Sequence, residues 1–228
     1  MTSWTLIEAL EHLRAEFDHE FPGRDHASDG AKGDTAHAGE SSDHNPDETG
    51  NTPYKDSDSI NEVHAIDVDA DLRRPGVTMQ DCIDIIVTRH RTGKMAVLQN
   101  IIHNRKIWSR SWGWTAQPYT GANPHDKHGH FSGRYGSGTG SSNPENYTGR
   151  WGLDEIMTKD ELRAVVDDAL SDFFARGSQG EANDNTVTSR VGRDALDQGV
   201  PNPIRGRKTP AWQLLGDVAA AVKPANPN

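Results

Sequence analysis

The feature that most constrains the fold is a long stretch almost without large apolar side chains, residues 24–62, which separates two groups of apolar segments. Gly, Asp, Ser, Asn and His dominate this polar loop, so we expect it to lie over a scaffold built by the rest of the chain. Only 33% of all residues are apolar, against a usual share of roughly 45–50% by a count that also includes Gly. A packed core is therefore expected from part of the chain only.

Apolar segments on either side of the polar loop predict the scaffold. Helices are expected over residues 5–19 and 78–91, each with a capping box at its start, formed by Thr5 with Glu8 and by Thr78 with Asp81. Segments rich in β-branched or aromatic residues predict strands at 63–69, 95–102, 106–109 and 128–132. The second and third strands are close enough to pair as a hairpin. Because helices and strands mix without a regular βαβ repeat, the fold class is α+β.

The C-terminal part of the sequence predicts a separate helical region. Residues 136–153 begin with a run rich in Gly, Ser and Asn and are expected to link it to a first domain of residues 1–135. Within 154–228, one helix is expected from Thr158 to Gly177 and another from Thr209 onwards, with a polar, mobile segment between them. Two such helices bury little apolar surface alone, so we expect them to target the protein, bind a partner or form a homo-oligomer.

Charge and composition argue against several classes of function. The chain has 24 basic and 34 acidic side chains, a net charge of −10. Both residues 1–150 and residues 151–228 are acidic, which disfavours nucleic acid and anionic membranes as partners. The single cysteine, Cys82, rules out an internal disulfide. No apolar run reaches the ~18–20 residues that span a bilayer, and the acidic N-terminus is not a secretory signal.

The most informative motif is His125-x-x-His128-x-His130. In a strand over 128–132, side chains alternate between faces, so His128 and His130 would share one face and could both reach one metal centre. Further ligands are expected from His44, which has no apolar neighbours to bury it, and from Asp67, because an unpaired carboxylate within a strand is costly. Two histidines and a carboxylate with an open fourth position are the ligand set of catalytic zinc sites.

Alternatives remain at these positions. The three clustered histidines could form a solvated turn, and His44 could be a surface histidine. Asp69 faces the same side of the strand as Asp67 and is the rival ligand. The D-x-D-x-D pattern at 67–71 does not match a calcium loop, because Leu72 and Thr78 stand where that loop needs Gly and Glu.

These motifs carry a family resemblance. In order, S-x-H, a strand ending in A-x-D, and H-x-x-H-x-H resemble the zinc peptidases related to D-alanyl-D-alanine carboxypeptidases and murein endopeptidases, which share a hedgehog-type fold. The strings SDGAKGDTAHAGESSDHNPD, VHAIDVD, NRKIWS and YTGANPHDKHGHFS resemble the peptidase domains of endolysins from phages of actinobacteria. The resemblance covers about residues 20–135.

The resemblance implies zinc bound by His44, Asp67 and His130, with His128 as the base and His125 stabilising the transition state. By residue chemistry, a protonated His125 could lie against the developing oxyanion. The sequence departs from the family pattern in two respects. An insertion, NPDETGNTPYKDSDSIN, places Asp67 23 residues after His44, and His64 stands where the family has Gly.

The fold implied is a small antiparallel sheet with flanking helices. The implied function is a zinc-dependent peptidoglycan hydrolase that cuts stem-peptide or cross-bridge amide bonds with metal-activated water. Such a phage endolysin or virion-associated enzyme would act on the bacterial cell wall, and without a signal peptide it would stay in the host cytoplasm until lysis or travel with the virion. The alternative is a non-catalytic zinc-containing tail, structural or binding protein of the same fold.

Other residues are candidates for supporting roles. Arg24 could receive a substrate carboxylate or be an ordinary surface arginine. Trp114 and Tyr119 could line a substrate groove or anchor loops. Ser42 and Asp43 flank His44 and could orient it. The remaining candidates share the polar loop, where ligand-orienting and loop-shaping roles are not separable by sequence: Asp29, Asp34 and His37.

Overall fold

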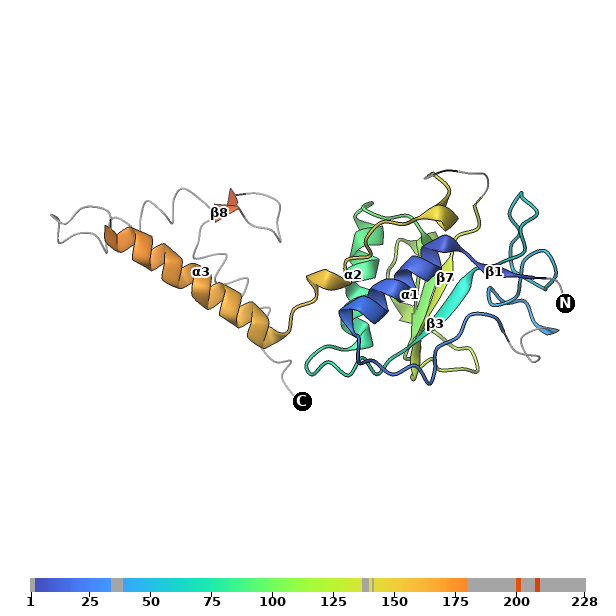
Figure 1. Cartoon of the computed structure of the whole chain (residues 1–228), viewed down its shortest axis with the longest axis horizontal. Helices are drawn as coiled ribbons and strands as arrows, with labels where there is room; N and C mark the ends of the chain where they lie inside the picture. Colours follow the sequence, from blue (N-terminus) through green and yellow to red (C-terminus); the bar gives the residue numbers. More distant parts are fainter. Residues whose placement is uncertain are drawn as a thin grey trace. The chain divides into compact units, whose positions relative to one another are not determined.

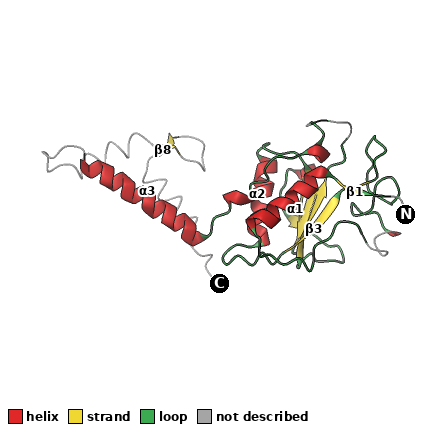
Figure 2. Cartoon of the chain, viewed as in Figure 1, coloured by secondary structure: helices red, strands yellow, loops and turns green. Residues whose placement is uncertain are grey.

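A computed structural model of the chain describes residues 3–33, 39–136, 140, 142–179, 200–201 and 208–209. The chain divides into two units, Met1–Ile156 and Met157–Asn228 (Figure 1). The first unit combines a small antiparallel sheet with α-helices, which confirms the α+β class (Figure 2). Among the described residues, no helix has the length and apolar content needed to cross a membrane.

The sheet that positions the site has five strands in the order β3-β7-β4-β5-β6, and all neighbouring pairs are antiparallel. The strands are β3 (Ala65–Asp69), β4 (Leu98–His103), β5 (Lys106–Ser109), β6 (Gln117–Pro118) and β7 (His128–Gly133). The predicted hairpin is the β4–β5 pair. In the β3–β7 ladder, Asp67 lies opposite His130 and Asp69 lies opposite His128.

Two helices of the first unit are α1 (Glu8–Glu20) and α2 (Met79–Arg91). Helix α2 begins with the predicted capping box of Thr78 and Asp81. The capping box predicted for α1 is wrong: the helix begins after Ile7 without a side-chain cap. The preceding residues Thr5–Leu6 instead form strand β1, which pairs in parallel with β2 (Glu62–Val63).

Both helices pack on one face of the sheet. Phe17 of α1 lies against Phe131 of β7, with ring centroids 5.8 Å apart. A Cβ added at Gly129 would lie 2.9 Å from Met79 Sδ of α2, so the glycine permits this close approach. Because side chains alternate along a strand, the side chains of Asp67 and His130 face the opposite side, where His44 of the polar loop contacts both.

The expected linker at 136–153 and the domain end at 135 are corrected by the structure. Trp151 and Leu153 are fully buried members of the core. The Glu16 carboxylate of α1 accepts hydrogen bonds from the backbone N–H groups of Trp151, Gly152 and Leu153, at 2.7, 2.8 and 2.9 Å. This segment includes the short helices η3 (Pro144–Asn146) and η4 (Leu153–Glu155). The first unit therefore extends to Ile156.

The second unit contains α3 (Lys159–Gln179), which starts with the predicted capping box of Thr158 and Glu161 and continues past the predicted end at Gly177. Leu162 and Val165 of α3 are exposed. Strand β8 (Val200–Pro201) pairs with β9 (Lys208–Thr209). The last helix is predicted to begin at Thr209, and the residues after Thr209 lie outside the described part of the chain. Targeting, partner binding or oligomerisation by this unit stays a prediction.

Candidate metal centre

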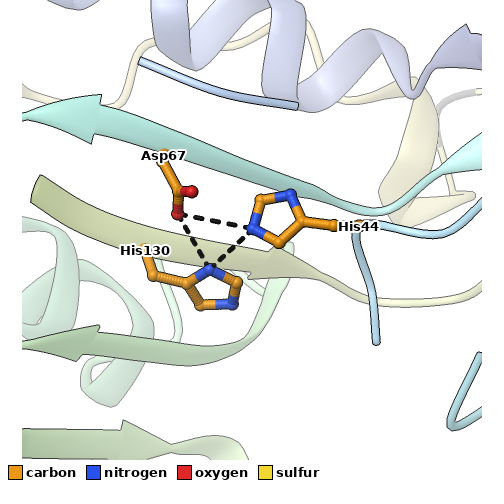
Figure 3. Close-up of side chains that lie close together, drawn as sticks. All are labelled: His44, Asp67 and His130. Atoms are coloured by element: carbon orange, nitrogen blue, oxygen red, sulfur yellow. Dashed lines mark hydrogen bonds and ion pairs between the residues drawn. The ribbon is translucent and has the colours of Figure 1, made fainter. Parts of the chain in front are cut away.

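Three side chains from separate segments point toward one another (Figure 3). His44 comes from the polar loop, Asp67 from β3 and His130 from β7. His44 Nε2 lies 3.1 Å from His130 Nδ1 and 3.4 Å from Asp67 Oδ1, and His130 Nδ1 lies 3.0 Å from Asp67 Oδ1. The three residues form a group that could hold a metal ion. The structure thus brings together the three ligands expected from the sequence.

The spacing of the three donor atoms suits one small divalent ion. Zinc–ligand bonds of about 2.0–2.2 Å at tetrahedral angles put neighbouring donor atoms about 3.3–3.6 Å apart. The three observed separations, 3.0, 3.1 and 3.4 Å, are close to that value. The sheet fixes two of the ligands, since Asp67 and His130 are direct neighbours across the β3–β7 ladder.

Hydrogen bonds to the outer ring nitrogens orient both imidazoles. His44 Nδ1 donates to the backbone carbonyl of Ala31, which leaves the Nε2 lone pair facing Asp67 and His130. His130 Nε2 lies 2.9 Å from the buried Ser132 Oγ, which leaves Nδ1 toward the centre. Contacts of this kind fix the tautomer and the ring plane of a ligating histidine. Ser132 was not foreseen, although strand alternation places it on the same face as His130.

The charges of the centre favour a bound cation. Burial alone would lower the pKa of His44, but the adjoining Asp67 carboxylate outweighs burial and the net pKa is raised. Burial alone would raise the pKa of Asp67, but hydrogen bonds with His130 and His44 hold this pKa well below its usual range. Asp67 is therefore ionised at neutral pH, which is the form that binds metals.

His128 lies beside the three ligands on the same face of β7. Its Nε2 atom is 3.6 Å from Asp67 Oδ1. This nitrogen is buried and has no hydrogen-bond partner among the described residues. Burial lowers the pKa of His128, only partly opposed by Asp67, so the imidazole is neutral near pH 7. A neutral imidazole with a free nitrogen next to a metal centre can act as a proton acceptor.

His125 completes the cluster of imidazoles. Its ring centroid lies 5.1 Å from that of His128 and 5.4 Å from that of His130. Burial, reinforced by these two histidines, lowers the pKa of His125 to about 4. The ring is therefore neutral at pH 7 in the resting chain, and a protonated His125 at the developing oxyanion stays a prediction. Its Nδ1 atom lies 2.9 Å from the backbone carbonyl oxygen of Asn123, to which it donates.

A hollow of about 470 Å³ opens beside His128. Its lining is polar and includes both signs of charge: Ser28, Asp29, Asn123, Asp126, Lys127 and His128. His128 therefore lies between the three ligands and a space that a hydrophilic substrate could enter.

Two of the three expected substrate residues have other roles. The Arg24 side chain is 0% exposed, and its guanidinium group is paired with Asp18 and Asp29, so it is not available to a substrate. Trp114 is buried in the core against His90. Tyr119 is half-buried and lies edge-on to His125, with ring centroids 5.2 Å apart, so it does border the site.

The other polar residues near the metal centre hold the surrounding backbone and side chains by hydrogen bonds. Asp69, the rival of Asp67, accepts hydrogen bonds from the backbone N–H groups of Ser28 and Asp71 at 2.8 and 2.9 Å and so shapes the loop. Asp29 accepts from the Asp69 backbone N–H at 2.8 Å. Near His44, Ser42 Oγ accepts from the His44 backbone N–H, and Asp43 accepts from the Tyr135 hydroxyl. Asp34 and His37 lie outside the described residues.

Comparisons of the chain with protein-family models, curated proteins and solved structures found no match. The family resemblance of the motifs therefore stays a prediction.

Proposed function

We propose that the chain is a zinc-dependent peptidase of bacterial peptidoglycan with a hedgehog/DD-peptidase-like fold, acting as a phage endolysin or a virion-associated wall hydrolase. The observation that carries the proposal is a three-ligand centre with an uncommitted imidazole beside it. His128 Nε2 is 3.6 Å from Asp67 Oδ1 and has no hydrogen-bond partner in the described part of the chain. Structural zinc sites use four protein ligands, whereas three ligands with a neighbouring base are typical of catalytic ones.

The residues of the site would divide the work of amide hydrolysis. When bound, zinc supplies a Lewis acid for the scissile carbonyl and lowers the pKa of a coordinated water toward about 7. His44, Asp67 and His130 hold the ion. Neutral His128 accepts a proton from the attacking water on Nε2 and passes it to the leaving amine. His125 already donates its Nδ1–H to Asn123, so it offers a second N–H only after taking up a proton.

The choice of peptidoglycan rests on the motif resemblance over about residues 20–135. The hollow beside His128 supports a polar substrate, because its lining combines Asp29 and Asp126 with Lys127. Stem peptides carry carboxylates and amines that such a lining can pair with. The net charge of −10 disfavours attraction to anionic wall polymers, so wall recognition would need contacts other than charge.

The test is the release of fragments from purified sacculi by the zinc-loaded full chain, followed by mass spectrometry with and without chelator. We expect fragments with new amino termini, which the chelator abolishes, and their masses identify the bond. His128→Ala should keep its zinc and lose at least about 100-fold in rate. His130→Ala should lose the zinc itself. His19→Ala, which removes a strongly exposed imidazole on α1, is the matched control.

The outcomes separate the parts of the proposal. Full zinc retention by His130→Ala would refute the ligand assignment. An active, zinc-loaded His128→Ala chain would remove His128 as the base. Zinc binding without any released fragment would favour the non-catalytic alternative.

A further inference from the structure

A second group of potential ligands lies away from the metal centre. Ligand atoms of Asp56, Glu62, His64 and Glu145 all lie within 4.8 Å of one another. They come from three segments: the polar loop, the β2–β3 junction and the short helix η3. Asp47 adjoins them, with Oδ2 at 3.3 Å from His64 Nε2, and both of these side chains are fully buried.

The group gathers four carboxylates in one place, counting Asp47. Among the described residues, no lysine or arginine forms an ion pair with the carboxylates of Asp47, Asp56, Glu62 or Glu145. Lys55 donates to the backbone carbonyl of Asp47, not to a carboxylate. Burial together with the neighbouring acids raises the pKa values of Asp56 and Glu62 to about 7. Buried carboxylates are normally paired or bound to a metal.

Two buried atoms of the group have no hydrogen-bond partner in the part of the chain that the structure describes. They are His64 Nδ1 and Asp56 Oδ2, and both side chains are 0% exposed. His64 Nδ1 lies 3.8 Å from Glu145 Oε1, and Asp56 Oδ2 lies 3.9 Å from His64 Nε2. Buried polar atoms without a partner are rare in folded proteins, so these two atoms, which face the cluster, indicate a ligand between the side chains.

We propose that Asp56, Glu62, His64 and Glu145, with Asp47 beside them, form a second divalent-cation site. One imidazole with several carboxylates suits an ion of the Mn²⁺ class, because oxygen donors favour hard cations and imidazole favours transition metals. This site is separate from the centre of His44, Asp67 and His130, and it does not depend on the proposed peptidase function.

A cation in this second site would hold the polar loop in the position that presents His44. The His64 backbone N–H donates to the Asp43 carbonyl at 3.0 Å. The His64 ring stacks on Tyr135, with centroids 3.8 Å apart, and the Tyr135 hydroxyl donates to the Asp43 carboxylate. Asp43 directly precedes His44, so the contacts run from the second site to the first.

The test uses the full chain with Asp67→Asn, which disables the first centre, stripped with chelator and titrated with Mn²⁺ by calorimetry. We expect one equivalent to bind and the Tm to rise. Adding Glu62→Gln should weaken binding at least about tenfold, because ligand charge sets cation affinity in such sites. Adding Glu40→Gln, which neutralises an exposed acid in the same loop, is the matched control and should leave binding unchanged.

No Mn²⁺ bound by the Asp67→Asn chain, or unchanged affinity after Glu62→Gln, would overturn the second site. The wild-type chain gives a test that needs no change in the cluster. The wild-type chain should bind two metal ions, and the Asp67→Asn chain one. If the wild-type chain binds only one ion and Asp67→Asn binds none, the proposal is also overturned. Because the Asp67→Asn chain lacks the proposed catalytic centre, a failed sacculus assay leaves this result unaffected.

Discussion

Replacing Ser132 by alanine tests how the fold prepares His130 for a metal. Ser132 is 1% exposed, and its Oγ lies 2.9 Å from His130 Nε2. When Nδ1 of His130 binds a metal, Nε2 carries the hydrogen and donates a hydrogen bond to Ser132 Oγ. The alanine variant leaves this N–H buried and unpaired while the metal-binding geometry is otherwise unchanged.

The size of the effect follows from that lost contact. A buried donor without a partner costs about 1–3 kcal/mol, which corresponds to roughly 5–150-fold in an equilibrium constant. Removing partners of ligating histidines typically costs about 10–100-fold in metal affinity. We therefore expect Ser132→Ala to bind zinc about 10–100-fold more weakly than the wild-type chain.

Zinc affinity can be measured by competition with a chromophoric chelator at fixed pH, with folding checked by circular dichroism. Ser109→Ala is the matched control, because Ser109 is a buried serine of the same sheet whose Oγ accepts a hydrogen bond from the Ser111 backbone N–H instead of contacting a histidine ring. An affinity within twofold of wild type for Ser132→Ala would refute the view that Ser132 orients His130.

Two further predictions concern the first unit. Trp151→Ala should lower the free energy of unfolding by about 3–5 kcal/mol in urea denaturation, because Trp151 is fully buried; a loss below about 1 kcal/mol would restore the linker interpretation. Burial lowers the pKa of His90 from 6.5 to about 4, so the unfolded chain binds the proton first as pH falls. Between pH 6.5 and 4, the contribution of His90 to stability, measured in chelator, should fall by about 3 kcal/mol. The His90→Gln chain should therefore lose about 3 kcal/mol less stability than the wild-type chain over this range, and equal pH slopes of the two chains would contradict this assignment.

Patterns within a few residues predicted local structure correctly where no distant partner competed. The capping boxes at Thr78 and Thr158 both start helices. The same pattern at Thr5 failed, because Thr5–Leu6 pair with Glu62–Val63 at the far end of the polar loop. A hydrogen-bonding partner so distant in the chain leaves no mark on the local sequence.

Composition misled where burial depends on distant segments. The Gly- and Ser-rich run suggested a linker, yet Trp151 packs in the core and Glu16 binds the backbone beside it. Arg24 and Trp114 are residue types that suit a substrate groove, but the fold buries both. The second acidic cluster was not foreseen either, since Glu145 joins the polar loop only in three dimensions.

The sequence alone determined the α+β class, and strand alternation placed His128 and His130 on one face because that alternation is set by each residue and its immediate neighbours. Tertiary structure decided that His44 reaches Asp67 and His130, that Ser132 supports His130, and where the first unit ends. These features require segments far apart in the chain to pack together, and such packing depends on the shape and burial of the whole unit.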